Sequence, residues 1–208
     1  MLAWITGVRQ RVLITADPIR FQLEGLMLEH DAAISDGGVQ LPIIRLIPAG
    51  WDRKHVCLAL GEDKSCVDHP AIRQMLQQGV AILSGDLFLL GEMGRRRLSP
   101  SPDPQGVRYH TTFHYTPDAY RIQDVALLWQ AARQMAPACT LWAQGVAARA
   151  VACALPLLPQ VQHAWLEADA LALRDDADYF KRFHGPGIML AGGIEGCLRL
   201  AECPVTRF

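Results

Sequence analysis

The sequence predicts an α/β protein: a mostly parallel sheet with helices on both faces and an antiparallel hairpin at its N-terminal end. Short, continuous apolar runs, typical of strands covered on both faces, alternate with segments of helical spacing. Half of the residues are apolar and a fifth are charged, which is a globular composition. The length of 208 residues suits one domain, so we expect a single domain over residues 1–208.

The first predicted element is a hairpin. Residues 19–29 alternate between apolar and polar side chains in the manner of a strand, and the turn signal Asp36, Gly37 and Gly38 follows. A second apolar stretch over 39–47 contains Pro42, which has no backbone N–H to donate. Because proline is tolerated at a sheet edge and not in a central strand, we expect this hairpin at an edge.

Strands and helices alternate after the hairpin, as in a parallel sheet with right-handed crossovers. A proline-rich segment over 95–105 is expected to be a surface loop. The predicted strands cover 56–60, 80–83, 140–143 and 161–166, with the opening of another at 204–208, and the predicted helices cover 68–78, 118–135, 147–158 and 188–200.

Charge and hydropathy exclude two classes of partner. The chain has 20 Lys and Arg against 21 Asp and Glu, whereas nucleic-acid binding by phosphate neutralisation requires a basic excess. The one basic run, at 95–97, has the composition of a solvated loop. No apolar run approaches the roughly 18–20 residues of a membrane-spanning helix. We therefore expect a soluble, cytoplasmic protein with neither a nucleic-acid partner nor a membrane partner.

The residues that bind metals and cofactors show no recognised spacing. Six cysteines are scattered without a C-x-x-C pair, mostly in apolar segments where a free thiol behaves as a small hydrophobe. His110 and His114 are four residues apart, but the β-branched and aromatic residues between them disfavour a helix. The glycine signatures of dinucleotide and phosphate loops are missing. No metal and no cofactor is predicted.

A turn between a predicted strand and a predicted helix resembles the nucleophile elbow, G-x-S-x-G. In that motif, the residues two before and two after the nucleophile are small, so that the strand and the helix can approach each other. Ala143 and Ala147 supply small flanks in this register, and Gly145 stands at the centre. Glycine adopts the unusual backbone angles of such a turn but offers no nucleophilic atom.

The order of the elements is similar to that of the α/β-hydrolase superfamily, and most similar to its acetyl xylan esterase and dienelactone hydrolase branch. The resemblance runs from about Phe21 to the C-terminus. It rests on Leu41-Pro42, on the turn from Gly61 to Lys64, on Gly79-Val80-Ala81 leading to Asp86 and Gly91-Glu92, on the helical residues 121–125 and on the segment 186–193.

The resemblance implies an ester hydrolase with a Ser-His-Asp/Glu triad and an oxyanion hole of backbone amides. Those amides would belong to Val146 and to the turn at Gly61 and Glu62. However, Gly145 replaces the nucleophile, and residues 204–208 would only open the strand that precedes the acid and the histidine. We therefore expect a catalytically inactive relative of ester hydrolases, with a small ester or carbohydrate as ligand. Its cleft would be lined by Asp86, Gln144, Glu167 and Asp169.

Three alternatives remain open. Ser65 or Cys66 could act as a nucleophile with His69 as base, although residues so close in sequence seldom point at one another. The chain could be an interaction module whose sheet is completed by a second copy or a partner chain, since a sheet edge invites pairing. It could also be a truncated copy of a longer enzyme. The exposed flank of the interaction module would contain Cys197, Leu198, Leu200 and Val205.

Overall fold

The computed structural model describes residues 12–14, 18–23, 25–35, 38–95, 116–173, 175–183 and 188–208. The predicted turn at Asp36 and Gly37, most of the predicted loop at 95–105, and His110 and His114 lie outside these residues.

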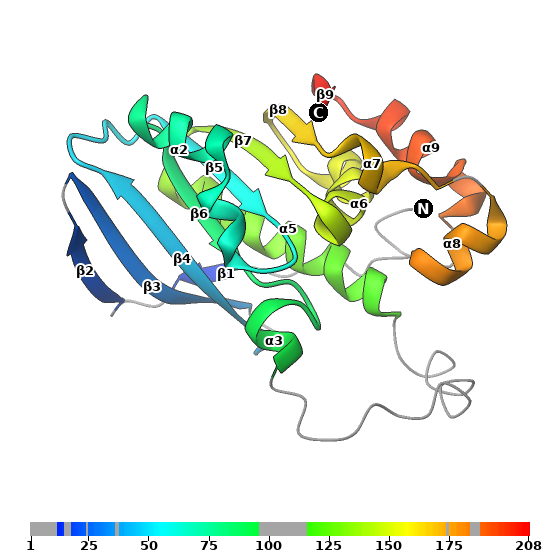
Figure 1. Cartoon of the computed structure of the whole chain (residues 1–208), viewed down its shortest axis with the longest axis horizontal. Helices are drawn as coiled ribbons and strands as arrows, with labels where there is room; N and C mark the ends of the chain where they lie inside the picture. Colours follow the sequence, from blue (N-terminus) through cyan, green and yellow to red (C-terminus); the bar gives the residue numbers. More distant parts are fainter. Residues whose placement is uncertain are drawn as a thin grey trace.

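Within the described residues, nine strands form one sheet in the order β1-β3-β4-β6-β5-β7-β8-β9, with β2 also paired to β3 (Figure 1). The strands β6, β5, β7, β8 and β9 are parallel to one another. Those on the N-terminal side pair antiparallel. The strands are β1 (Val12–Ile14), β2 (Ile19–Leu23), β3 (Leu26–Ser35), β4 (Gln40–Pro48), β5 (His55–Leu60), β6 (Ala81–Gly85), β7 (Ala138–Ala143), β8 (Val161–Leu166) and β9 (Val205–Arg207).

This architecture confirms the predicted fold class, with two corrections at the N-terminal end. Residues 19–29 do not form one strand, because the chain reverses at Gly25 and β2 pairs with β3. The hairpin of β3 and β4 is not at an edge, because β4 also pairs with β6. The β4–β6 ladder begins at Ile43, so Pro42 lies just outside it and its missing N–H breaks no bond of that ladder.

The predicted helices are present, and the one over 188–200 is broken in two at Gly192, whose backbone is left-handed. Three short helices were not predicted: α3, which follows β6, and α7 and α8, which follow β8. The α-helices are α2 (Pro70–Gln77), α3 (Gly91–Arg95), α5 (Pro117–Met135), α6 (Gly145–Ala154), α7 (Ala168–Leu171), α8 (Asp176–Arg182) and α9 (Gly193–Leu200), and the 3-10 turns are η1 (Lys64–Asp68), η3 (Leu155–Leu157) and η4 (Met189–Ala191).

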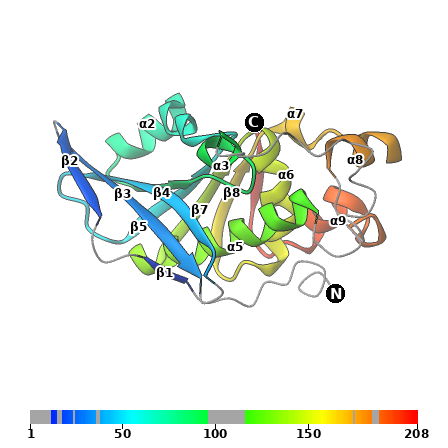
Figure 2. The ribbon, with the colours of Figure 1, turned by 90° about the horizontal axis from the view of Figure 1, so that it is seen from below.

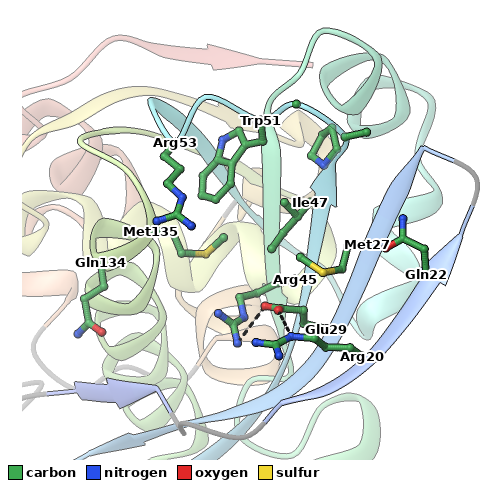
Figure 3. Close-up of a pocket in the computed structure, with 13 residues that line it drawn as sticks. Arg20, Gln22, Met27, Glu29, Arg45, Ile47, Trp51, Arg53, Gln134 and Met135 are labelled. Carbon is green, nitrogen blue, oxygen red and sulfur yellow. Dashed lines mark hydrogen bonds and ion pairs between the residues drawn. The ribbon is translucent and has the colours of Figure 1, made fainter.

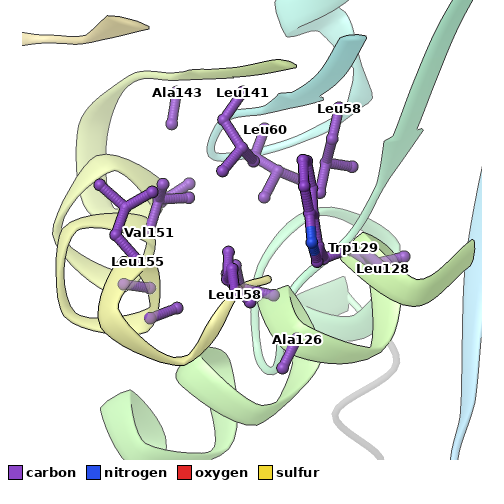
Figure 4. Packing of buried hydrophobic residues seen from close by; sticks show 14 of the residues in the cluster. Leu58, Leu60, Ala126, Leu128, Trp129, Leu141, Ala143, Val151, Leu155 and Leu158 are labelled. Carbon is purple, nitrogen blue, oxygen red and sulfur yellow. The ribbon is translucent and has the colours of Figure 1, made fainter. Parts of the chain in front are cut away.

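Helices cover both faces of the sheet, as predicted (Figures 1 and 2). On one face α5 and α6 pack against β5 and β7, where Leu58 and Leu141 face Trp129 and Val151 (Figure 4). On the other face α2 covers a smaller core that includes Ile72 and Trp142. Burial on both faces explains why β5 and β6 are almost continuous apolar runs.

The six cysteines are free thiols, and five of them are buried. Among them, Cys197 lies in the core, so it is not part of the exposed flank expected beside β9. Leu198 and Val205 are partly buried, and Leu200 is exposed. Among the described residues, no helix combines the length and the hydropathy needed to cross a membrane.

Candidate functional site at the β7–α6 turn

Gly145 lies in a tight turn between the carboxyl end of β7 and the start of α6. Strand β7 ends at Ala143, Gln144 occupies the N-cap position without a side-chain capping bond, and Gly145 is the first residue of α6, with φ at +59°. Left-handed angles of this kind strain any residue with a Cβ. The flanking Ala143 and Ala147 are fully buried, so strand and helix approach closely as the elbow pattern requires.

Two carboxylates converge on Gly145 from neighbouring strands. The amide of Gly145 donates a hydrogen bond of 2.6 Å to Oε2 of Glu167, which follows β8. A Cβ added at Gly145 would lie 3.1 Å from Cγ and 3.2 Å from Oε1 of Glu62, which follows β5. Because all three strands are parallel, their carboxyl ends meet at one edge of the sheet. The corner where a nucleophile would stand is therefore bordered by acidic side chains.

The residues expected to form an oxyanion hole lie around the same corner. Val146 is the second residue of α6, where a backbone amide has no carbonyl partner within its own helix. Gly61 is buried at the end of β5, and a Cβ there would lie 2.7 Å from Cβ of Cys66 and 3.4 Å from Nε2 of Gln144. The two turns are thus packed against each other, with Gln144 between them.

Asp86 belongs to an adjoining cluster beyond the end of β6. Its side chain is buried, and its Oδ2 lies 3.6 Å from Nζ of Lys64 and accepts a 2.9 Å bond from the amide of Glu92. Burial raises the pKa of Asp86, although the Glu92 amide and the Lys64 charge oppose the rise. The amide of Gly91 donates to the carbonyl of Glu62 at 2.9 Å, which ties this cluster to the elbow. A cavity of about 190 Å³ lies here.

The fourth predicted cleft residue, Asp169, is exposed in the first turn of α7. The structure places Glu62, Gln144 and Glu167 around one edge of the sheet, whereas Asp86 lies in the adjoining cluster after β6. The signal for all of them was the same, a polar residue directly after a buried strand.

The residues of the alternative nucleophile and base, Ser65, Cys66 and His69, do not face a common point. Oγ of Ser65 donates to Asp63, and Cys66 is buried against Ser84 and the carbonyl of Ala59. Burial raises the pKa of Cys66 to about 11, so it is a neutral thiol at pH 7. His69 instead caps α2, accepting from the amide of Ala71, and its ring lies 4.7 Å from that of Trp142.

Sequence reasoning missed Arg149, one turn after Gly145 on α6. Its side chain is buried, and its Nε and Nη1 find no hydrogen-bond partner in the part of the chain that the structure describes. Burial lowers its pKa, and the charges of Arg182 and Arg121 act in the same direction. A single arginine in an alanine-rich helix carries no sequence signal of this burial. Within the described ranges, His, Cys, Asp and Glu form no group suited to a metal ion.

Comparison with solved structures identifies the architecture. The acetyl xylan esterase 1 of Thermoanaerobacterium sp. JW/SL YS485 matches with a TM-score of 0.65 at 12% identity, over 99% of this chain and 75% of that one. The glucuronoyl esterase of Solibacter usitatus matches with a TM-score of 0.62 at 10% identity, over 99% and 73%. The chain has the α/β-hydrolase fold.

A structure of a proposed acetyl xylan esterase from Bacteroides fragilis is also similar to this α/β-hydrolase fold, with a TM-score of 0.61 at 12% identity over 100% of this chain and 72% of that one. No protein-family model matches the sequence, and no curated protein does either. The likeness is therefore one of fold. The resemblance inferred from the order of elements is confirmed at that level.

Proposed function

We propose that this chain is a non-catalytic α/β-hydrolase-fold protein, related in architecture to acetyl and carboxyl ester hydrolases, that does not cleave esters. The observation that carries the proposal is Gly145 at φ +59° in the elbow turn, where the fold requires a side chain that attacks. Such a protein keeps the edge of the sheet on which a small ester or carbohydrate would bind, without the step that breaks a bond.

The charges around Gly145 support the same proposal. Acyl transfer develops a negative oxygen, and each donor of an oxyanion hole contributes roughly 3–4 kcal/mol to the transition state. Here Glu167, which accepts from the Gly145 amide, and Glu62 both lie beside the turn. A negative oxygen about 4 Å from either carboxylate would meet roughly 4 kcal/mol of repulsion at the dielectric typical of such a site. This repulsion offsets the gain that the Val146 amide would supply as an oxyanion-hole donor.

The proposal is tested by hydrolysis of 4-nitrophenyl acetate by the wild type, Gly145→Ser and Gly79→Ser. Gly79 is a second left-handed glycine, with open space around it, and serves as the matched control. We expect all three proteins to show the same slow release of nitrophenolate, linear in ester concentration, because a serine without a base gains little. Saturable hydrolysis by the wild type would contradict the proposal.

An active enzyme using Ser65 or Cys66 is the alternative that the same assay separates. If the wild type hydrolyses the ester, Ser65→Ala and Cys66→Ala are compared with it. If either variant loses the activity, the chain is an enzyme that uses that residue. If both variants keep it, the reaction takes place at other residues.

A second candidate function is an interaction module. Within the described residues β9 pairs only with β8, and Leu200 and Phe208 beside it are 56% and 44% exposed. A free strand edge next to apolar side chains favours pairing with another chain. Sedimentation of the purified protein over a range of concentrations tests this function. A monomer at all concentrations that also fails to bind an apolar dye would count against it.

A further inference from the structure

A cavity of about 870 Å³ lies at the opposite end of the parallel strands from Gly145. It is bounded by β2, β3 and β4, by the loop that leads into β5, and by the last residues of α5 (Figure 3). Its position follows from the chain, because β5 begins at His55 directly after this loop and β7 begins just after α5. The volume is in the range of small-molecule sites.

The floor of the cavity is a chain of ion pairs on the paired strands. Nε of Arg20 lies 2.8 Å from Oε1 of Glu29, and Nη2 of Arg45 lies 3.1 Å from its Oε2. Arg45 also contacts Oδ2 of Asp31 at 2.7 Å. The register explains the cluster, since Glu29 is opposite both Arg20 on β2 and Arg45 on β4. Glu29 and Asp31 are buried, and these ion pairs compensate their two charges.

Positive charge and donors remain after these pairs are formed. Arg53, on the loop before β5, is exposed and reaches over the cavity towards Met135 (Figure 3). With Arg53 included, three guanidinium groups face two carboxylates, so the cluster keeps one positive charge in excess. A ligand that complements this surface is an anion.

The remaining walls are apolar and aromatic. Trp51 donates its indole N–H to the carbonyl of His55 at 2.8 Å, which satisfies its polar end and leaves the ring for packing. Met27 and Met135 bring thioether side chains, which make favourable contacts with aromatic rings, and Ile47 lies between Trp51 and Met27 (Figure 3).

We propose that this cavity is a binding site for an aromatic carboxylate, with the carboxylate held by Arg53 and the ring packed against Trp51 and the two methionines. The site is separate from the elbow, so it does not depend on whether Gly145 supports chemistry. Bidentate recognition of a carboxylate by arginine gives the site its preference for an anion over a neutral ring of the same shape.

The experiment is calorimetric titration of the purified chain with three probes of one shape: 2-naphthoate, 2-naphthylmethanol and 2-naphthylmethylamine. We expect saturable binding of the naphthoate, binding of the alcohol weaker by about tenfold or more, and no binding of the amine. Added salt should lower the affinity of the chain for the naphthoate and leave its affinity for the alcohol unchanged.

Two variants and a control locate the binding. Arg53→Gln should lower the affinity for the naphthoate about tenfold without changing the affinity for the alcohol. Met135→Ala should lower the affinity for both probes by a similar factor. Arg73→Gln, which changes an exposed arginine on α2 that is paired with Asp68, should change neither. Thermal unfolding of each variant confirms that it is folded. Equal affinity for the three probes, an unchanged affinity in Arg53→Gln, or no saturable binding would overturn the proposal.

Discussion

The backbone amide of Gly145 and the carboxylate of Glu167 are joined by a hydrogen bond of 2.6 Å, across the carboxyl ends of two adjacent strands. The bond places a negative charge at the N-terminus of α6, where the helix dipole favours an anion. It also removes from the turn an amide that would otherwise be free to bind a ligand.

Loss of the Glu167 carboxylate should therefore destabilise the fold. Glu167→Ala leaves the Gly145 amide without its acceptor, and we expect the free energy of unfolding to fall by about 1–2 kcal/mol. Glu167→Gln, which keeps an acceptor oxygen but no charge, should lose less. Urea unfolding measures both variants. Asp169→Ala, an exposed carboxylate two residues later, is the control and should change stability by less than about 0.5 kcal/mol.

A side chain at Gly145 should interact unfavourably with Glu62. Gly145→Ser should cost about 1–3 kcal/mol, because the residue is left-handed and its Cβ would crowd the Glu62 side chain. Glu62→Ala should recover about 1 kcal/mol of that loss in the double variant. Gly79→Ser is left-handed with open space around it, so it should show the backbone cost alone. Purely additive effects at Glu62 and Gly145 would show that the two residues do not interact.

Gly91 should tolerate no side chain while Asp86 is present. Its φ is +51°, and an added Cβ would overlap the buried Asp86 carboxylate. Gly91→Ala should lower the free energy of unfolding by roughly 2–4 kcal/mol, more than Gly25→Ala, where nothing lies near the added atom. Thermal or chemical unfolding compares the two. The prediction is wrong if both alanines have the same effect, or if Asp86→Ala leaves the cost of Gly91→Ala unchanged.

Asp124 on α5 should make the protein less stable at pH 8 than at pH 5. Burial raises its pKa to about 7, although the hydrogen bond from the Phe88 amide and the charge of Arg121 oppose the rise. The folded state therefore holds a proton that the unfolded state has lost between about pH 4 and pH 7, so this carboxyl group lowers stability as pH rises through that window.

Replacing Asp124 by Asn tests the assignment. The amide oxygen of Asn can still accept from the Phe88 amide but carries no charge, so Asp124→Asn should reduce the loss of stability between pH 5 and pH 8. At pH 8 the variant should be more stable than the wild type by an amount on the order of 1 kcal/mol or more. Urea unfolding at several pH values measures how the free energy of unfolding changes with pH. An identical pH dependence in the two proteins would show that another group causes it. Asp118→Asn, on the same helix, is the comparison.

The sequence alone determined the alternation of strands and helices. Strands buried on both faces must be apolar throughout, so β5, β6 and β7 are visible as short apolar runs. The tight turn after β7 was visible for a related reason: Ala143, Gly145 and Ala147 are small because strand and helix meet there. Both signals are local, so a single sequence carries them.

The tertiary structure decided what lies next to what. The reversal at Gly25 and the central place of β4 depend on which strands pair with each other. The alternation of apolar and polar side chains along a strand is the same whichever strand it pairs with, so it does not identify the partner. Glu62 reaches Gly145 only because β5 and β7 are neighbours in the sheet. Arg20, Glu29 and Arg45 meet through the register of three strands. Contacts between residues far apart in the chain arise from packing. They could not be predicted from the sequence because no local preference encodes them.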